Sequence, residues 1–120
     1  VVCYDLRFPV WCRNSGNLYD LLIVPANWPA SREFAWSRLL QARAIENQAY
    51  VVGINRSGSD KFGDYGGMDR VYDYTGHPVD IVVPSEGCIQ YARLSHEALE
   101  HWRNDFPVLN DRDSFDIICR

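Results

Sequence analysis

Cys3 has the sequence context of a nucleophile exposed on a sharp strand-to-helix turn. Two β-branched residues, Val1 and Val2, lead into it, and residues 4–7 turn the chain toward Pro9, which can open a short helix. Backbone N–H groups in such a turn have no helical acceptor, so they can stabilise a thiolate or an oxyanion. The alternative is that Cys3 is a small buried hydrophobe, as most free cysteines are.

The remaining cysteines and the histidines do not form a pattern of metal ligands. The four cysteines contain no CxxC pair and lack the dense spacing of secreted disulfide proteins. The three histidines are scattered, so the sequence predicts no metal site and no cofactor. Reduced thiols favour a cytoplasmic location. The residues concerned are Cys3, Cys12, Cys88, Cys119, His77, His96 and His101.

The composition indicates one globular domain. The chain has 120 residues, of which 47% are hydrophobic and 13% aromatic, which is enough to form a packed core. A formal net charge of −4 gives no electrostatic reason to expect nucleic acid or an anionic membrane as a partner. Because the chain opens on a strand-like pair and closes on the apolar run 115–120, we expect a piece of a longer polypeptide.

The first half of the chain is expected to hold two buried strands around one helix. A short helix over 8–13 precedes the apolar run 19–24, which is typical of a strand covered on both faces. Ser31 can cap an amphipathic helix that extends to about Gln48. A second buried strand follows over 49–54.

The loop 26–30 follows the first of these strands. Loops at the carboxyl ends of strands line the ligand crevice of an open α/β sheet. We therefore expect Asn27 and Trp28 on the same side of the sheet as the turn that follows Cys3. Core packing is the alternative role for Trp28.

Charged residues on the helix 31–48 have two possible roles. Arg38, Arg43 and Glu46 can be solvated, as most helix charges are, or they can pair across a subunit contact.

The second half is expected to form a β-meander and a final helix, so the whole order predicts a layered α/β domain. The glycine-rich loop lacks the strand–GxGxxG–helix context of a phosphate-binding loop. The expected elements are a polar loop 55–60, a flexible surface loop 61–68, strands 69–74, 79–83 and 88–94 joined by turns 75–78 and 84–87, and a helix that Ser95 caps and that ends before Pro107.

Several stretches together resemble the nitrilase (carbon–nitrogen hydrolase) superfamily, in the right order over essentially the whole chain. The segment 3–9 (CYDLRFP) is similar to the nucleophile segment of that family, and 24–29 (VPANWP) to its pocket loop. The segment 43–47 (RAIEN) is similar to its helix signature. Gly76 matches its Asp-x-x-Gly hairpin, and 100–107 (EHWRNDFP) resembles the C-terminal helix of omega-amidase-type members.

The resemblance implies an α-β-β-α sandwich that pairs into larger sandwiches through helix contacts. It implies that 1–120 is the C-terminal half of a single carbon–nitrogen hydrolase domain, incomplete at the N-terminus. It also implies a homodimer or larger homo-oligomer as the assembled form.

The resemblance implies a mechanism that uses a Glu, a Lys and a Cys. Cys3 would attack an amide carbon to form a thioester, and the Glu would then deprotonate the hydrolytic water. The Lys would support the oxyanion, and the backbone N–H of Tyr4 would donate to it.

In omega-amidase-type members the substrate is the terminal amide of a small 2-oxo dicarboxylate monoamide. By resemblance, Arg7 would hold the substrate carboxylate, because a guanidinium suits bidentate binding, and Asn27 and Trp28 would line the pocket. The alternative for Arg7 is a structural pairing with Asp5.

Two departures from the family pattern limit the prediction. The Glu and Lys of the family precede its cysteine, and neither Glu33 nor Glu46 replaces the base, because both belong to a structural helix. We therefore expect this chain alone to be inactive. Asp69 stands where the family more often has serine, and its carboxylate can alter the pocket or face solvent.

Two other functions are compatible with the sequence. One is a catalytically inactive remnant that acts through oligomer contacts, and the other is an amidase of different specificity, such as a carbamoyl-amino-acid hydrolase.

Overall fold

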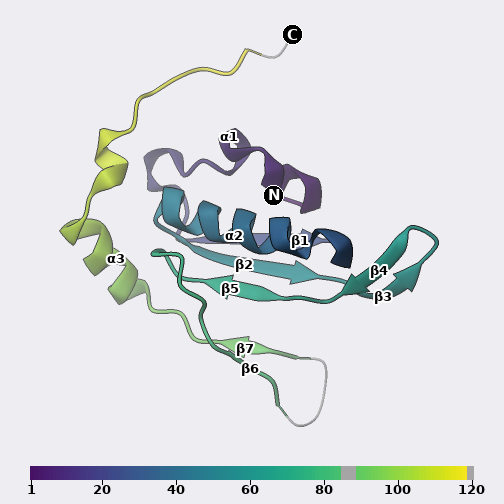
Figure 1. The fold of residues 1–120 in the computed structure, drawn as a ribbon. Helices are drawn as coiled ribbons and strands as arrows, with labels where there is room; N and C mark the ends of the chain where they lie inside the picture. Colours follow the sequence, from purple (N-terminus) through teal and green to yellow (C-terminus); the bar gives the residue numbers. More distant parts are fainter. Residues whose placement is uncertain (85–88, 119–120) are drawn as a thin grey trace.

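The protein is built on a small mixed sheet that one long helix covers. The computed structural model describes residues 1–84 and 89–118 (Figure 1). Strand β1 (Leu21–Ala26) runs parallel to β2 (Tyr50–Asn55), and β5 (Arg70–Tyr72) is antiparallel to β2, which gives the strand order β1-β2-β5. Helix α2 (Glu33–Asn47) packs across β2 and β5. The predicted α/β class is confirmed.

The contact between α2 and the sheet depends on large side chains and one glycine. Trp36 and Leu40 are completely buried on the helix face that meets the sheet. Gly53 of β2 makes this approach possible, since a Cβ there would lie 2.4 Å from Leu40 Cδ1 and 2.6 Å from Trp36. Phe34 and Ile45, two apolar positions of the same helix, are exposed instead.

The start of α2 differs from the prediction. Ser31 lies in a 3-10 turn, η3 (Ala30–Arg32), and α2 begins at Glu33 without a side-chain cap. Its C-terminal end is close to the predicted one, because Gln48 adopts a left-handed conformation (φ 42°) that terminates the helix.

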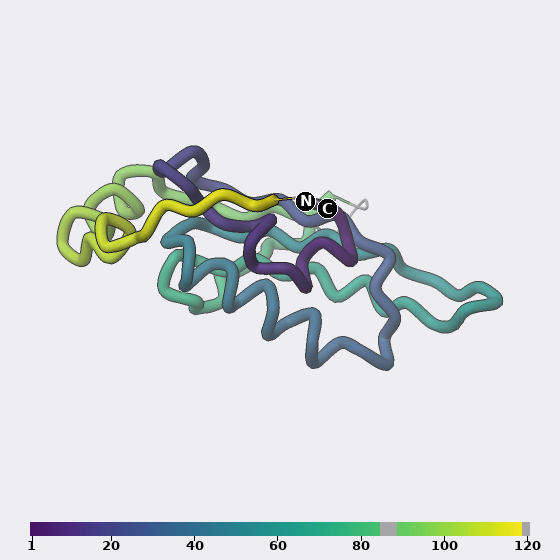
Figure 2. The backbone as a smooth tube through the Cα atoms, turned by 90° about the horizontal axis from the view of Figure 1, so that it is seen from above, coloured from purple at the N-terminus to yellow at the C-terminus, as the bar shows by residue number. Residues whose placement is uncertain are grey.

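Residues 57–66 form a hairpin, so the prediction of a flexible loop over 61–68 is wrong. Strands β3 (Ser57–Asp60) and β4 (Gly63–Gly66) pair in antiparallel register and extend beyond the sheet (Figures 1 and 2). Arg56 stabilises the hairpin along its length, because its guanidinium lies 4.3 Å from the Tyr65 ring centre and 2.7 Å from Asp60 Oδ2. These contacts are specific to the fold and offset the low strand propensity of the glycines.

The meander forms with a different pairing from the one expected. Residues 79–83 were expected to pair with the strand now seen as β5, but only a Tyr72–Pro78 bridge and a 2.9 Å bond from Val79 N–H to Val71 O connect them. Strand β6 (Ile81–Val82) pairs instead with β7 (Tyr91–Ala92). The predicted turn 84–87 and the start of the strand 88–94 lie outside the described residues, apart from Pro84.

The final helix confirms its prediction. Helix α3 (His96–Asp105) begins after Ser95, whose hydroxyl accepts a 3.1 Å hydrogen bond from Ala98 N–H, and it ends before Pro107. A short turn, η4 (Val108–Asp111), follows. The apolar run 115–120 was expected to be strand-like, but the structure assigns no strand over 115–118, and residues 119–120 lie outside the described residues.

The N-terminal segment forms short helical turns beside α2. These are η1 (Cys3–Arg7), α1 (Pro9–Cys12) and η2 (Ser15–Asn17). Contacts of η1 with both β1 and α2 place Cys3 at the edge of the core. No helix among the described residues is long and apolar enough to cross a membrane.

Candidate active site

Cys3 occupies a strained turn at the start of η1. Its φ of 47° lies in the left-handed region, which residues other than glycine seldom adopt and which often marks a functional position. Two hydrogen bonds close the turn around it. Val2 N–H donates to Asp5 Oδ2 at 3.0 Å, and Asp5 N–H donates to Val2 O at 3.0 Å. Cys3 is therefore held in a fixed backbone geometry with a half-buried side chain.

The backbone N–H of Tyr4 makes no hydrogen bond within the turn that holds Cys3. Cys3 and Tyr4 are the first two residues of η1, and Asp5 is the first to donate a hydrogen bond along the turn. The N–H groups of the first helical positions have no helical acceptor, so the Tyr4 N–H is available to a ligand. Its role as an oxyanion donor stays a prediction.

Arg43 of α2 supports the other end of η1 and was missed as a site residue. Its Nη2 donates to Leu6 O at 2.7 Å, and its Nη1 donates to Glu46 Oε1 at 2.9 Å. Because Arg43 is buried within the chain, the expectation of a solvated or intersubunit charge is wrong for it. The family-like segment 43–47 was the sequence feature that could have identified Arg43. Asn47 of the same segment also binds the N-terminal part of the chain, because its Oδ1 accepts a 2.8 Å hydrogen bond from Asn14 N–H.

Arg7 lies over Trp28, which confirms that the loop after β1 faces the turn after Cys3. The Arg7 guanidinium carbon is 4.7 Å from the Trp28 ring centre, a cation–π distance. Trp28 is buried and lies 5.3 Å from Trp36, so it belongs to the core and also contacts Arg7. Asn27 beside it is exposed.

The structure does not form the alternative pairing of Arg7 with Asp5. The Asp5 carboxylate accepts the Val2 N–H instead. Within residues 1–84 and 89–118, the guanidinium of Arg7 makes no ion pair and donates no hydrogen bond. A stacked guanidinium with unused donors can bind a planar anion such as a carboxylate.

Asn55 holds the backbone of Trp28 and was also missed from the sequence. Its Oδ1 accepts from Trp28 N–H at 2.7 Å, and its Nδ2 donates to Trp28 O at 2.9 Å. Asp69 Oδ1 in turn accepts from Asn55 N–H at 2.8 Å. The Asp69 carboxylate is thus bonded within the fold, which the sequence left open.

Cys12 and the two glutamates of α2 are already buried or paired. Burial raises the pKa of the Cys12 thiol, which favours its neutral form. Glu33 Oε1 lies 2.9 Å from Arg70 Nη2, and Glu46 pairs with Arg43. These contacts agree with the expectation that neither glutamate is the general base.

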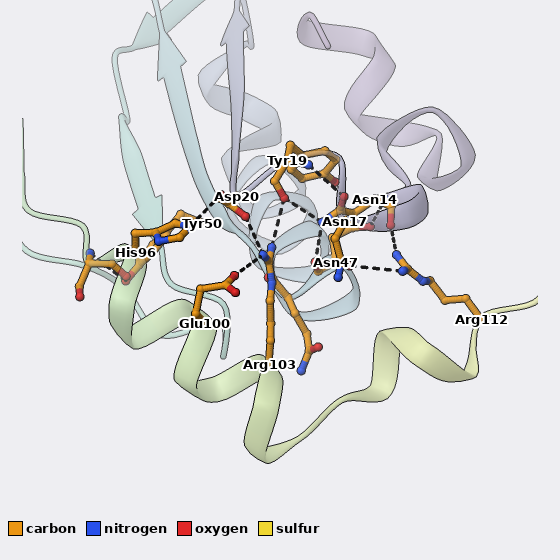
Figure 3. Close-up of polar contacts among 12 residues, drawn as sticks. Asn14, Asn17, Tyr19, Asp20, Asn47, Tyr50, His96, Glu100, Arg103 and Arg112 are labelled. Carbon is orange, nitrogen blue, oxygen red and sulfur yellow. Dashed lines mark hydrogen bonds and ion pairs between the residues drawn. The ribbon is translucent and has the colours of Figure 1, made fainter.

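One group of metal-type ligands lies at the base of α3 (Figure 3). Donor atoms of Asp20, His96 and Glu100 lie within 4.8 Å of one another. Arg103 Nη1 is 2.6 Å from Asp20 Oδ1 and 3.1 Å from Glu100 Oε1. Because the guanidinium already supplies positive charge to both carboxylates, we assign this group as an ion-pair network.

The fold and site define a mixed α/β domain in which one short 3-10 segment carries a strained cysteine at its start and a stacked arginine at its end. The chain belongs to the carbon-nitrogen hydrolase family, whose model matches residues 1–104.

Named relatives and a solved structure share this similarity. The chain is 50% identical to omega-amidase YafV of Escherichia coli strain K12 over 96% of its own length and 45% of the relative. It is 42% identical to the 2-oxoglutaramate amidase of Paenarthrobacter nicotinovorans, over 92% of this chain and 37% of that protein.

The structure of XC1258 from Xanthomonas campestris, a CN-hydrolase superfamily protein, superposes with a TM-score of 0.84 and 40% identity. The match covers 97% of this chain and 46% of that one. The chain thus spans about half the length of the curated relatives it matches.

Proposed function

We propose that this chain supplies the nucleophile and the carboxylate-binding arginine of an amidase. The substrate would be a small 2-oxo dicarboxylate monoamide, and the products would be the dicarboxylate and ammonia. The observation that carries the proposal is the pair formed by Cys3, in its left-handed turn, and Arg7, stacked on Trp28. The names of the relatives, omega-amidase and 2-oxoglutaramate amidase, support the substrate class.

The reaction would proceed in two steps at Cys3. The thiolate sulfur attacks the amide carbon, and the carbon–nitrogen bond breaks as the leaving nitrogen takes up the proton that the thiol gave up. Ammonia departs, and the acyl group stays on sulfur as a thioester. Water then attacks the thioester carbon and releases the carboxylate product and the thiol. The Tyr4 N–H would stabilise the tetrahedral oxyanion of each step, and one such donor is typically worth about 3 kcal/mol.

Arg7 would orient the substrate from its far carboxylate. Two parallel N–H donors of one guanidinium match the two oxygens of a carboxylate. The Trp28 ring below the guanidinium limits its motion, which lowers the entropy lost on binding.

The general base and the lysine of the family mechanism would be supplied by residues outside 1–84 and 89–118. Glu33 and Glu46 are engaged by arginines. Lys61, at the far tip of the β3–β4 hairpin, lies 4.9 Å from the Phe62 ring centre. We therefore expect the 120-residue chain alone to release no ammonia, whereas the native protein does.

Ammonia release from 2-oxoglutaramate tests this function. We expect Cys3→Ala to abolish release by the native protein, and Arg7→Ala to raise KM for the 2-oxo acid amide much more than for an uncharged amide. Equal effects of Arg7→Ala on both substrates would favour the other amide specificity. Robust turnover by the 120-residue chain would show that the base lies within it.

We propose a reduced, cytoplasmic setting and assembly into a homo-oligomer. Cys3 and Cys12 are both free thiols, which supports the first point.

A further inference from the structure

Asp69 stands at a point where the pairing of the sheet stops. The last pair between β2 and β5 is Gly53 with Arg70, so on this side of β2 the backbone N–H of Asn55 lies beyond the β2–β5 pairing. The Asp69 side chain takes the place of the missing strand partner, since its Oδ1 accepts that N–H at 2.8 Å. Asn55 is buried, so its N–H would otherwise lose its acceptor without gaining water.

The side chain of Asn55 extends the order of the sheet into the loop after β1. The parallel pairing of β1 with β2 ends at Ala26 and Asn55, two residues before Trp28. Beyond that point the Asn55 amide binds both backbone polar groups of Trp28, at 2.7 and 2.9 Å. The indole N–H of Trp28 is fixed as well, because it donates to Arg32 O at 2.9 Å. Asn55 therefore holds the backbone that carries the Trp28 ring, while Arg32 and the packing against Trp36 hold the ring itself.

Arg7 depends on that ring for its position. Its guanidinium lies 4.7 Å from the ring centre, and no described residue offers it an acceptor. A cation–π contact holds a cation only over the face of the ring. A change in the orientation of Trp28 would therefore move the guanidinium.

We propose that Asp69 is a positioning residue that sets the place of the Arg7 guanidinium through Asn55 and Trp28, and thereby the preference of the site for a carboxylate-bearing substrate. This inference rests on the proposed role of Arg7. It gives the carboxylate at position 69 a function that acts through a hydrogen bond, not through its charge.

Paired alkylation of Cys3 measures this preference without turnover. Iodoacetate and iodoacetamide react with a thiolate in the same way, forming a sulfur–carbon bond as iodide leaves, but only iodoacetate carries a carboxylate. The ratio of the two rates at Cys3 cancels changes in thiolate fraction and in exposure. It therefore reports the positive charge that meets the reagent, and peptide mapping of the full chain assigns each adduct.

We expect Arg7→Ala to lower the iodoacetate-to-iodoacetamide ratio by about two- to fivefold, the size of one partly exposed ion pair. Asp69→Ala should lower it in the same direction. Asp69→Asn should keep the wild-type ratio, because the amide oxygen still accepts the Asn55 N–H. Asn55→Ala, which removes both bonds to Trp28, should also lower the ratio, and Lys61→Ala at the hairpin tip should not change it.

The sign of the effect separates positioning from direct electrostatics. Loss of a nearby negative charge would raise the ratio in Asp69→Ala and Asp69→Asn alike, and this outcome would overturn the inference. A wild-type ratio in Asp69→Ala, with a lowered ratio in Arg7→Ala, would also overturn it while leaving the proposed function intact. An unchanged ratio in Arg7→Ala would instead remove the role of Arg7 from the proposed function, and the inference with it.

Discussion

Two cysteines nine positions apart in the sequence have opposite environments. Cys3 begins η1 in a left-handed conformation, with its side chain half-buried at the edge of the core. Cys12 ends α1 and is almost completely buried, with its Sγ 3.9 Å from Asp5 O. The same chemical group is thus presented to reagents at one position and enclosed at the other. Of these two cysteines, Cys3 alone has the access that a nucleophile needs.

Thiol labelling should distinguish these two residues. We expect iodoacetamide at pH 8 to modify Cys3 about tenfold faster than Cys12 or more, because burial shields Cys12 and raises its pKa, which lowers its thiolate fraction. Timed quenching followed by peptide mass spectrometry gives both rates in one sample. Equal rates at Cys3 and Cys12 would contradict the assignment of Cys3 as the reactive thiol.

The raised pKa of Cys12 also predicts how stability depends on pH. A thiol whose folded pKa lies above its unfolded value favours the folded state in full below the unfolded pKa. That contribution is lost as the pH rises toward the folded pKa. Between pH 7 and pH 9 we therefore expect the free energy of unfolding in urea to fall by about 1 kcal/mol at most.

The control for this measurement is Cys12→Ala, which should remove most of the pH dependence. Tyr19 does not interfere in this window, because burial raises its pKa further above its ordinary alkaline value. If the free energy of unfolding of Cys12→Ala falls with pH as steeply as that of the wild type, then groups other than Cys12 cause the pH dependence.

At the scale of elements, Arg103 makes several of the polar contacts that join α3 to the rest of the molecule. Arg103 Nε donates to Gln48 O at 3.0 Å, and Nη2 donates to Tyr19 O at 3.1 Å, while Nη1 pairs with Asp20 (Figure 3). Gln48 ends α2 in the left-handed conformation, so its carbonyl lies where helix carbonyls have no helical partner. Arg103 thus caps α2 and fixes α3 to the start of β1.

Arg103→Ala should separate α3 from this junction. Hydrogen bonds that involve a charged group contribute about 1.5–3 kcal/mol, and the almost buried guanidinium makes several, so we expect a loss of about 3 kcal/mol in the free energy of unfolding. His101→Ala on the same helix is the matched control, because its side chain is exposed and, among the described residues, pairs with Asp105 alone. Urea denaturation with hydrogen exchange of the α3 amides measures both. Equal stability of the two variants would show that α3 is held by Leu99 and its apolar neighbours alone.

The elements that were predicted correctly are those marked by a local sequence feature, such as a capping residue or an apolar run. Ser95 caps α3 as expected, and the apolar runs around β1 and β2 form strands. Hairpin β3–β4 was not predicted, because its glycines have low strand propensity and its stability comes from Arg56 on Tyr65. The pairing of β6 with β7 is a choice between partners that only the three-dimensional fold makes.

The candidate site was predictable in its residue types but not in its contacts. Cys3 and Arg7 were identified from one contiguous segment. The helical spacing predicts a solvated charge or an intersubunit pair for Arg43, because spacing alone does not show which side a long side chain turns toward. The sequence predicts a loop at Asn55, and its bonds to Trp28 join residues 27 positions apart, which no local pattern indicates.

At the scale of the whole molecule, the described chain is a flat slab. Its principal extents are 44 × 42 × 19 Å, and its radius of gyration is 15.6 Å. A compact domain of this length has a radius of gyration of about 13.6 Å. Leu22 and Val24 of β1 are buried, so the alternating Leu21 and Ile23, which are exposed, face away from α2. In the α-β-β-α sandwich that the resemblance implies, a second sheet would cover this face.

The helix side carries the surface that we expect to join copies of the native protein. Phe8, Val10 and Trp11 of the α1 segment are large, apolar and exposed, and exposed tryptophan is among the strongest interface residues. If family-type pairing occurs through helices, Trp11→Asp should reduce the mass of the native protein in solution to that of a smaller species. Multi-angle light scattering over a range of concentrations measures that mass. Asp at position 11 removes the aromatic contact and adds a charge that an apolar interface cannot accept.

Ile23→Asp, at the other face of the slab, is the matched control for this prediction. A second sheet over that face would make Ile23 part of the core of the native protein, so its replacement should lower the free energy of unfolding and leave the association constant of the folded protein unchanged. The two variants thus separate a contact between copies from a contact within one copy. If Trp11→Asp keeps the wild-type mass while Ile23→Asp dissociates a folded oligomer, the sheet side joins the copies and the helix side is free.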